Sequence, residues 1–166
     1  MLDESIGVLK ETVSIEQSNN WSSGIFSKRE AKQLRQEFWT SFGKSFTKDW
    51  ILYNTKVKGL SFKFHFDTKS ALVTLDIEGP IENRIKYWRK LQSLKEILIN
   101  KYLPNAIFAE TFHLENGKEI SRVYVHISDK VSIHNKDTWQ KTMLFFNNTM
   151  SAFEDFFDTY EDFISA

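Results

Sequence analysis

The chain has no cysteine, and only six glycines and two prolines occur among its 166 residues. The absence of cysteine excludes disulfides, cysteine-ligated zinc sites and a thiol nucleophile. The glycines do not cluster, and the motifs GxxxxGK[ST], GxGxxG, HExxH and GxSxG are all missing. These absences argue against nucleotide-dependent catalysis, and we expect no cofactor and no metal.

The chain also lacks net charge and long apolar runs. Twenty-two basic residues balance twenty-two acidic ones, so no global field draws the chain to nucleic acid or to anionic lipid. No window is apolar for long enough to span a bilayer. The N-terminus carries acidic residues and no long apolar run, so it does not have the pattern of a signal peptide. We therefore expect a protein of the reducing cytoplasm that has no contact with a membrane.

Aromatic residues, in contrast, are abundant: they make up 15% of the chain, and fifteen of them are Phe. The segment EFWTSFGKSF, residues 37–46, has four rings within ten positions. On a helical wheel these rings share an arc of about 140° with Leu34 and Ala31. Such an arc is typical of a helix face turned toward a core, so we interpret the rings as packing residues and not as a ligand surface.

Periodicity and turn signals predict an α+β domain with a four-stranded antiparallel sheet and helices packed on one face. We expect residues 1–25 to be a loosely structured extension and residues 26–166 to be a single domain. A capping box at Ser27 and Glu30 marks the first helix, and Asn116-Gly117 marks the second hairpin. The expected order is helix 28–47, strands 60–66 and 71–78, helix 81–102, strands 107–114 and 119–127, and helix 136–163 with Asn135 as its N-cap.

Four charged residues lie within or beside the apolar patterns of the expected helices and strands. Arg35 and Lys95 lie within the apolar arcs of their helices, Arg122 begins a strand, and Glu110 lies between two Phe residues. A buried charge is costly unless it is paired. The side chains either snorkel to water, form a structural ion pair with Glu110, or build a small pocket that binds a phosphate or carboxylate.

A carboxylate pair suggests a second, catalytic hypothesis. Asp76 and Glu78 end an apolar strand, as the metal-binding acids of restriction-type nucleases do, and Lys95 and Glu110 would complete such a site. The short acid-x-Lys element expected of these nucleases is missing, because Gly79 follows Glu78. Acids at a strand end are also typical of a solvated turn.

Several segments together resemble the bacterial family called domain of unknown function 4268. They are LRQEFWTSF at 34–42, LKEIL at 94–98, SRV at 121–123 and VSIHNKDTW at 131–139. The resemblance covers residues 27 to 164 and implies a stand-alone, bacterial, cytoplasmic member. Some members of this family are fused to nuclease-like or restriction-associated domains.

We therefore predict a non-catalytic binding or interaction module associated with DNA restriction or defence. The alternatives are a metal-dependent nuclease and a homodimeric scaffold. A protein partner, a second copy and nucleic acid all stay open as partners, with nucleic acid the least supported by the sequence.

Overall fold

The computed structural model describes residues 27–166, so the expectation for residues 1–25 lies outside the described residues. The first element is helix α2, Lys28–Ser45. The Ser27 side-chain oxygen accepts a hydrogen bond from the Glu30 amide at 3.2 Å, which confirms the predicted cap. Phe38 and Phe42 of this helix are buried, so the ring-rich segment belongs to the core.

The four strands form one antiparallel sheet in the order β1-β2-β4-β3, which confirms the predicted α+β class and its four-stranded sheet. The two predicted hairpins pair as β1 with β2 and β3 with β4, and β2 and β4 are the central strands. Gly117 takes a left-handed φ of 85° in the second turn, which is the conformation that glycine adopts most easily. The strands are β1 Leu60–Phe66, β2 Ala71–Ile77, β3 Ile107–His113 and β4 Glu119–His126.

The single helix predicted over 81–102 is wrong, because the structure has two helices there, α3 Ile81–Ser93 and α4 Lys95–Lys101. The Ser93 hydroxyl donates to the Lys90 carbonyl at 2.7 Å, a back-bond that bends helices. Leu94 leaves the helical conformation at this point, and its side chain is buried.

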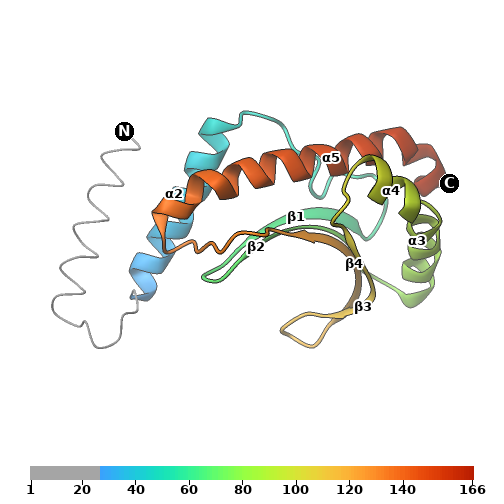
Figure 1. The fold of residues 1–166 in the computed structure, drawn as a ribbon. Coiled ribbons are helices and arrows are strands. Elements are labelled where there is room, and N and C mark those ends of the chain that lie inside the picture. Colours follow the sequence, from blue (N-terminus) through green and yellow to red (C-terminus); the bar gives the residue numbers. More distant parts are fainter. Residues whose placement is uncertain (1–26) are drawn as a thin grey trace.

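The last helix begins later than predicted. Asn135 caps a short 3₁₀ turn, η1 Lys136–Thr138, and helix α5 follows as Trp139–Ser165. Figure 1 shows α5 along the sheet, with α2 near one end of α5 and α3 and α4 near the other. Among residues 27–166, every helix is too short or too polar to span a lipid bilayer.

Aromatic rings join the helices to the sheet. The Phe38 ring centre lies 4.7 Å from that of Phe66 on β1, 5.3 Å from that of Trp139 and 6.1 Å from that of Phe146 on α5. Further along α5, Phe153 and Phe157 contact Phe62 of β1 at centre distances of 5.9 and 5.6 Å. The even-numbered residues of β1 therefore point toward the helices, as their alternation predicts.

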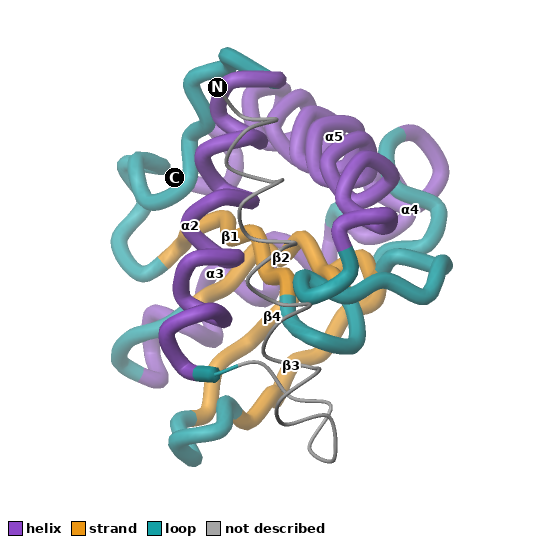
Figure 2. Tube along the Cα trace, turned by 90° about the vertical axis from the view of Figure 1, so that its left-hand side faces the viewer, coloured by secondary structure: helices purple, strands orange, loops and turns teal. Residues whose placement is uncertain are grey.

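The sheet bends strongly. Strands β4 and β3 curve away from α5, so the sheet surface that faces away from α5 is concave (Figure 1). Seen from the end, β3 lies at the margin of the sheet farthest from α5 (Figure 2).

Residues 46–59 form a long connection that covers the free edge of β1. The Phe62 amide donates to the Leu52 carbonyl at 3.0 Å, and Leu52 and Lys56 have positive φ angles of 46° and 61°. Gly59, with a φ of 85°, meets the end of β2 so closely that a Cβ there would lie 2.3 Å from the Glu78 carbonyl oxygen. This loop is therefore held in a defined, partly strained conformation beside the sheet.

Candidate functional site

The strand register places polar side chains in rows across the concave surface. Ser61, Asp76 and Arg122 are neighbours in one row, on β1, β2 and β4. The next row contains Lys63, Thr74 and Tyr124, and the following one His65, Leu72 and His126. We call this surface the polar face, because its side chains alternate with those that point toward the helices.

A buried ion pair lies at the centre of the polar face. Arg122 Nε lies 2.7 Å from Asp76 Oδ1, and Arg122 Nη2 lies 2.9 Å from Asp76 Oδ2. The Arg122 side chain is 6% exposed and that of Asp76 is fully buried. The Phe112 ring centre lies 4.4 Å from the guanidinium carbon, so the guanidinium stacks on an aromatic ring. This two-pronged geometry is the strongest form of an arginine–carboxylate contact.

Two lysines extend the pair into a network of five ionised groups. Lys63 Nζ lies 3.2 Å from Asp76 Oδ2 and 2.9 Å from Glu78 Oε2. Lys118 Nζ lies 2.8 Å from Glu78 Oε1, and its side chain is 52% exposed. The network therefore runs from a buried arginine to a solvent-exposed lysine, and its three cations exceed its two carboxylates by one charge.

The pKa values favour the charged forms within this network. Burial would lower the pKa of Lys63, but the hydrogen bond to Glu78 and the charges of Asp76 and Glu78 outweigh it and raise that pKa. The hydrogen bond from Lys118 lowers the pKa of Glu78 against the opposing effect of burial. In contrast, burial and the charge of Arg122 lower the pKa of His65, whose Nε2 lies 3.1 Å from the Thr74 hydroxyl. At neutral pH Lys63 and Glu78 are therefore charged and His65 is neutral.

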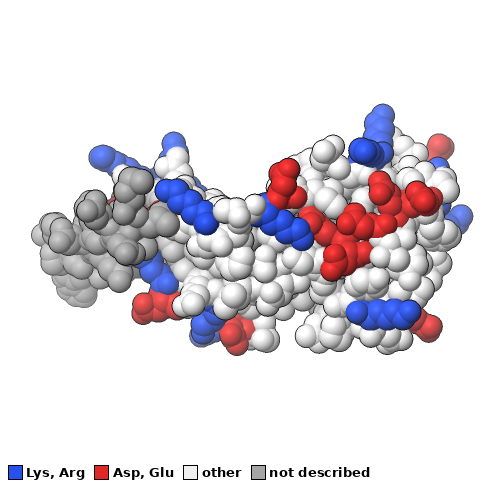
Figure 3. All heavy atoms as spheres, turned by 90° about the horizontal axis from the view of Figure 1, so that it is seen from above, with Lys and Arg blue, Asp and Glu red and all other residues white. Residues whose placement is uncertain are grey.

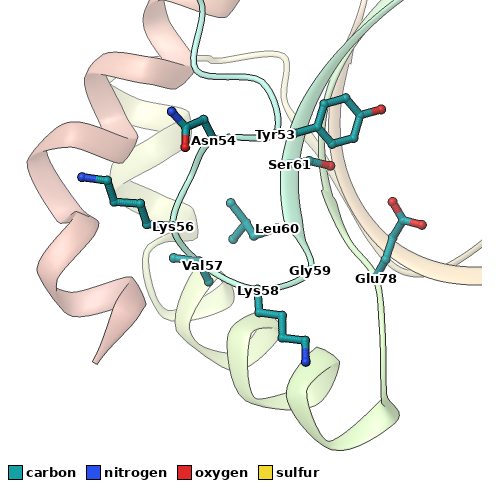
Figure 4. Close-up of a pocket in the computed structure, with 9 residues that line it drawn as sticks. All are labelled: Tyr53, Asn54, Lys56, Val57, Lys58, Gly59, Leu60, Ser61 and Glu78. Atoms are coloured by element: carbon teal, nitrogen blue, oxygen red, sulfur yellow. The ribbon is translucent and has the colours of Figure 1, made fainter.

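A pocket of about 440 Å³ adjoins the network at Glu78. Loop 53–59, the start of β1 and Glu78 line it. Tyr53 is 73% exposed, and its ring centre lies 5.8 Å from Lys63 Nζ. Figure 4 shows the Tyr53 ring and the Glu78 carboxylate on the same side of the loop, with Ser61 between them, while Lys56 points away.

Part of the surface on the α5 side of the molecule is acidic. Acidic side chains gather on the surface seen from the α5 side (Figure 3). The C-terminal part of α5 has Asp155, Asp158, Glu161 and Asp162 and no basic residue in its last turn. This acidic cluster disfavours a polyanion at this part of the molecule.

The structure does not assemble the pocket predicted from Arg35, Lys95, Glu110 and Arg122. Arg35, Lys95 and Glu110 are all exposed, which agrees with side chains that reach water from the apolar arcs. Lys95 instead lies over the Phe108 ring, with its Nζ 5.3 Å from the ring centre.

A β-bulge explains why Phe112, and not another residue of β3, stacks on Arg122. The register shifts between Ala109 and Phe112, so Phe108 lies opposite Val123 on the helix side while Phe112 lies opposite Ile120 on the polar face. Strict alternation would have placed both rings on the same side.

The acids of the nuclease hypothesis, Asp76 and Glu78, belong to the network instead. Both Asp76 oxygens contact Arg122, and one also contacts Lys63. Among residues 27–166, no three His, Asp or Glu side chains are grouped so that they could hold a metal ion. Lys95 and Glu110 make no contact with either acid among the interactions of the described residues.

Sequence reasoning missed Lys63, Lys118, Phe112 and Tyr53. Lys63 alternates with Phe residues in its strand, which was a local signal for the polar face. No local pattern connects Lys118 to Glu78 or Phe112 to Arg122. These contacts depend on how β2, β4 and β3 pair.

A family model described as a domain of unknown function, DUF4268, matches residues 34–161. The chain belongs to the DUF4268 family. The match includes all five members of the ion network and also Tyr53. No curated protein and no solved structure matches this DUF4268 chain.

Proposed function

We propose that this DUF4268 domain is a non-catalytic binding module and that its polar face binds an anionic ligand. In this proposal the helices pack on one face of the sheet and leave the other face for the ligand. The observation that carries the proposal is the excess of positive charge in the network formed by Lys63, Asp76, Glu78, Lys118 and Arg122.

The network has the properties of a preorganised cation site. Glu78 holds the ammonium groups of Lys63 and Lys118 within 2.9 Å of its oxygens, so both cations are positioned before a ligand arrives. The buried Arg122–Asp76 pair is in turn fixed by two hydrogen bonds. Preorganisation lowers the entropic cost of binding.

The contacts favour binding over catalysis. A nuclease would need Asp76 and Glu78 free to hold a divalent ion, whereas each carboxylate has cationic partners at 3.2 Å or less. The association with DNA restriction or defence and the location in a bacterial cytoplasm remain part of this proposal and depend on the family resemblance alone.

Titration with inorganic polyphosphate at increasing salt tests the proposal. We expect Lys118→Gln to weaken binding about five-fold, since one exposed charge contact contributes about 1 kcal/mol. We expect Lys63→Gln to weaken it at least as much. Lys32→Gln, which removes an exposed cation of α2, is the matched control and should leave the affinity unchanged.

Absence of polyphosphate binding would reject the proposal. Binding that is lost in Lys32→Gln but retained in Lys118→Gln would move the anion site to α2. Metal-dependent cleavage of DNA or RNA that disappears in Glu78→Gln would replace the binding module with the nuclease alternative.

A further inference from the structure

The lining of the pocket and the network combines positive charge with an exposed ring. Four cations and two carboxylates give a local excess of two positive charges in a chain whose overall net charge is zero. The cations are Lys58, Lys63, Lys118 and Arg122, and the acids are Asp76 and Glu78. A surface with this excess favours a polyanion.

Tyr53 is the most exposed large apolar or aromatic side chain of the described residues, at 73%. Its loop is braced on both sides: the Leu52 carbonyl accepts from Phe62, and the Thr55 hydroxyl donates to the Leu60 carbonyl at 2.7 Å. The ring is therefore displayed on a fixed support beside Lys63, open to a flat partner. Exposed rings next to lysines are the usual stacking platforms for unpaired bases.

We propose that the ligand of the polar face is single-stranded nucleic acid, with a base stacked on Tyr53 and the phosphodiester backbone along Lys63 and Lys118. This inference depends on the proposed function above. Phe112 and Tyr124, whose ring centres lie 6.1 Å apart and which are half-buried on the polar face, offer a second aromatic surface farther along the sheet. A four-stranded sheet that presents rings and cations from one face suits splayed bases.

The cation chemistry separates this ligand from an acidic peptide. Carboxylates are best bound by the fork of a free arginine. Arg122 is the arginine of the network, and Asp76 already occupies its Nε and Nη2. The ammonium groups of Lys63 and Lys118 act as point charges that suit phosphodiesters.

The proposed stacking on Tyr53 requires a single strand and not a duplex. Tyr53 can stack only on a base whose face is free, and the bases of a duplex cover each other. The pocket beside Tyr53, about 440 Å³, is lined by Asn54 and Ser61 and has room for a single base edge.

Binding of labelled probes to the full 166-residue chain, measured by fluorescence anisotropy, tests the inference. The probes are a thymidine oligonucleotide of about ten nucleotides, an abasic sugar-phosphate strand of equal length, the corresponding duplex and a polyglutamate of equal charge. We expect the thymidine strand to bind about ten-fold more tightly than the abasic strand. We expect the duplex and polyglutamate to bind more weakly than the thymidine strand.

Variants of Tyr53 assign that difference to the ring. Tyr53→Ala should lower the affinity for the thymidine strand about ten-fold and leave the affinity for the abasic strand unchanged. Tyr53→Phe should keep the wild-type affinity for both. Phe163→Ala, which removes an exposed ring of α5, is the matched control and should change neither.

The outcomes distinguish this inference from the proposed function. Equal affinity for thymidine and abasic strands, or a Tyr53→Ala chain that binds both as wild type does, overturns the stacking inference while the anion site stands. Tighter binding of the duplex or of polyglutamate overturns the ligand class. Failure to bind any of these polyanions overturns both proposals.

Discussion

Asp76 and Arg122 are opposite charges almost completely removed from water on the polar face. Desolvation of both ions is costly, and their two hydrogen bonds together with the Lys63 contact offset that cost. Removing only one partner would leave the other charge buried without compensation. Glu78, in contrast, is 23% exposed and can exchange its partners for water.

We therefore expect Asp76→Asn to lower the free energy of unfolding by about 3–5 kcal/mol, because the Arg122 guanidinium would stay buried without a carboxylate. Glu78→Gln, the matched isosteric change in the same network, should cost about 1 kcal/mol or less. Urea denaturation monitored by tryptophan fluorescence measures both. A cost for Asp76→Asn no larger than that for Glu78→Gln would contradict this account of the pair.

At the scale of elements, the connection over residues 46–59 determines where Tyr53 lies. Thr55 is 2% exposed, and its hydroxyl lies 3.1 Å from both the amide and the carbonyl of Val57 and 2.7 Å from the Leu60 carbonyl. A single side chain thus satisfies backbone groups that the left-handed turn at Lys56 leaves without strand partners.

Thr55→Val keeps the shape of this side chain and removes its hydrogen bonds. We expect it to lower the free energy of unfolding by about 1–3 kcal/mol, because buried backbone groups lose their partners. Amide hydrogen exchange should quicken at Val57 before the sheet is affected. Thr47→Val, at an exposed position of the same loop, is the control, and equal exchange in the two variants would refute the bracing role of Thr55.

At the scale of the whole molecule, one aromatic core connects α2, the sheet and α5. Phe38 is fully buried and contacts rings from all three. Phe163, near the end of α5, is 47% exposed. Charge is distributed unevenly around this core: acids cluster on the C-terminal part of α5, and the network on the polar face has one more cation than carboxylates.

We expect Phe38→Ala to destabilise the domain by about 3–5 kcal/mol, because it leaves a cavity where α2, α5 and the sheet meet. Phe163→Ala should change the stability by about 0.5 kcal/mol or less. Urea unfolding followed by circular dichroism and by tryptophan fluorescence measures both. Coincident transitions are expected in the wild type, and a small effect of Phe38→Ala would show that the helices are not coupled to the sheet through this ring.

The sequence predicted most secondary structure, because its signals are local. The cap at Ser27, the alternation in β1 and the glycine of the second hairpin each depend on neighbours within a few residues. The burial predicted for Phe38 and Phe42 followed from helical periodicity in the same way. The predicted order of helices and strands was correct, apart from the break at Leu94 and the late start of α5.

The candidate site, in contrast, was decided by tertiary structure. Asp76 and Arg122 are 46 residues apart in the chain and meet only because β2 pairs with β4 in one particular register. One bulge in β3 brings Phe112 to the polar face, where its ring stacks on Arg122. By itself the sequence determined which side chains are charged or aromatic and which elements carry them. Which of these groups became neighbours depended on strand pairing and on the bulge, and no periodicity within a single segment encodes either one.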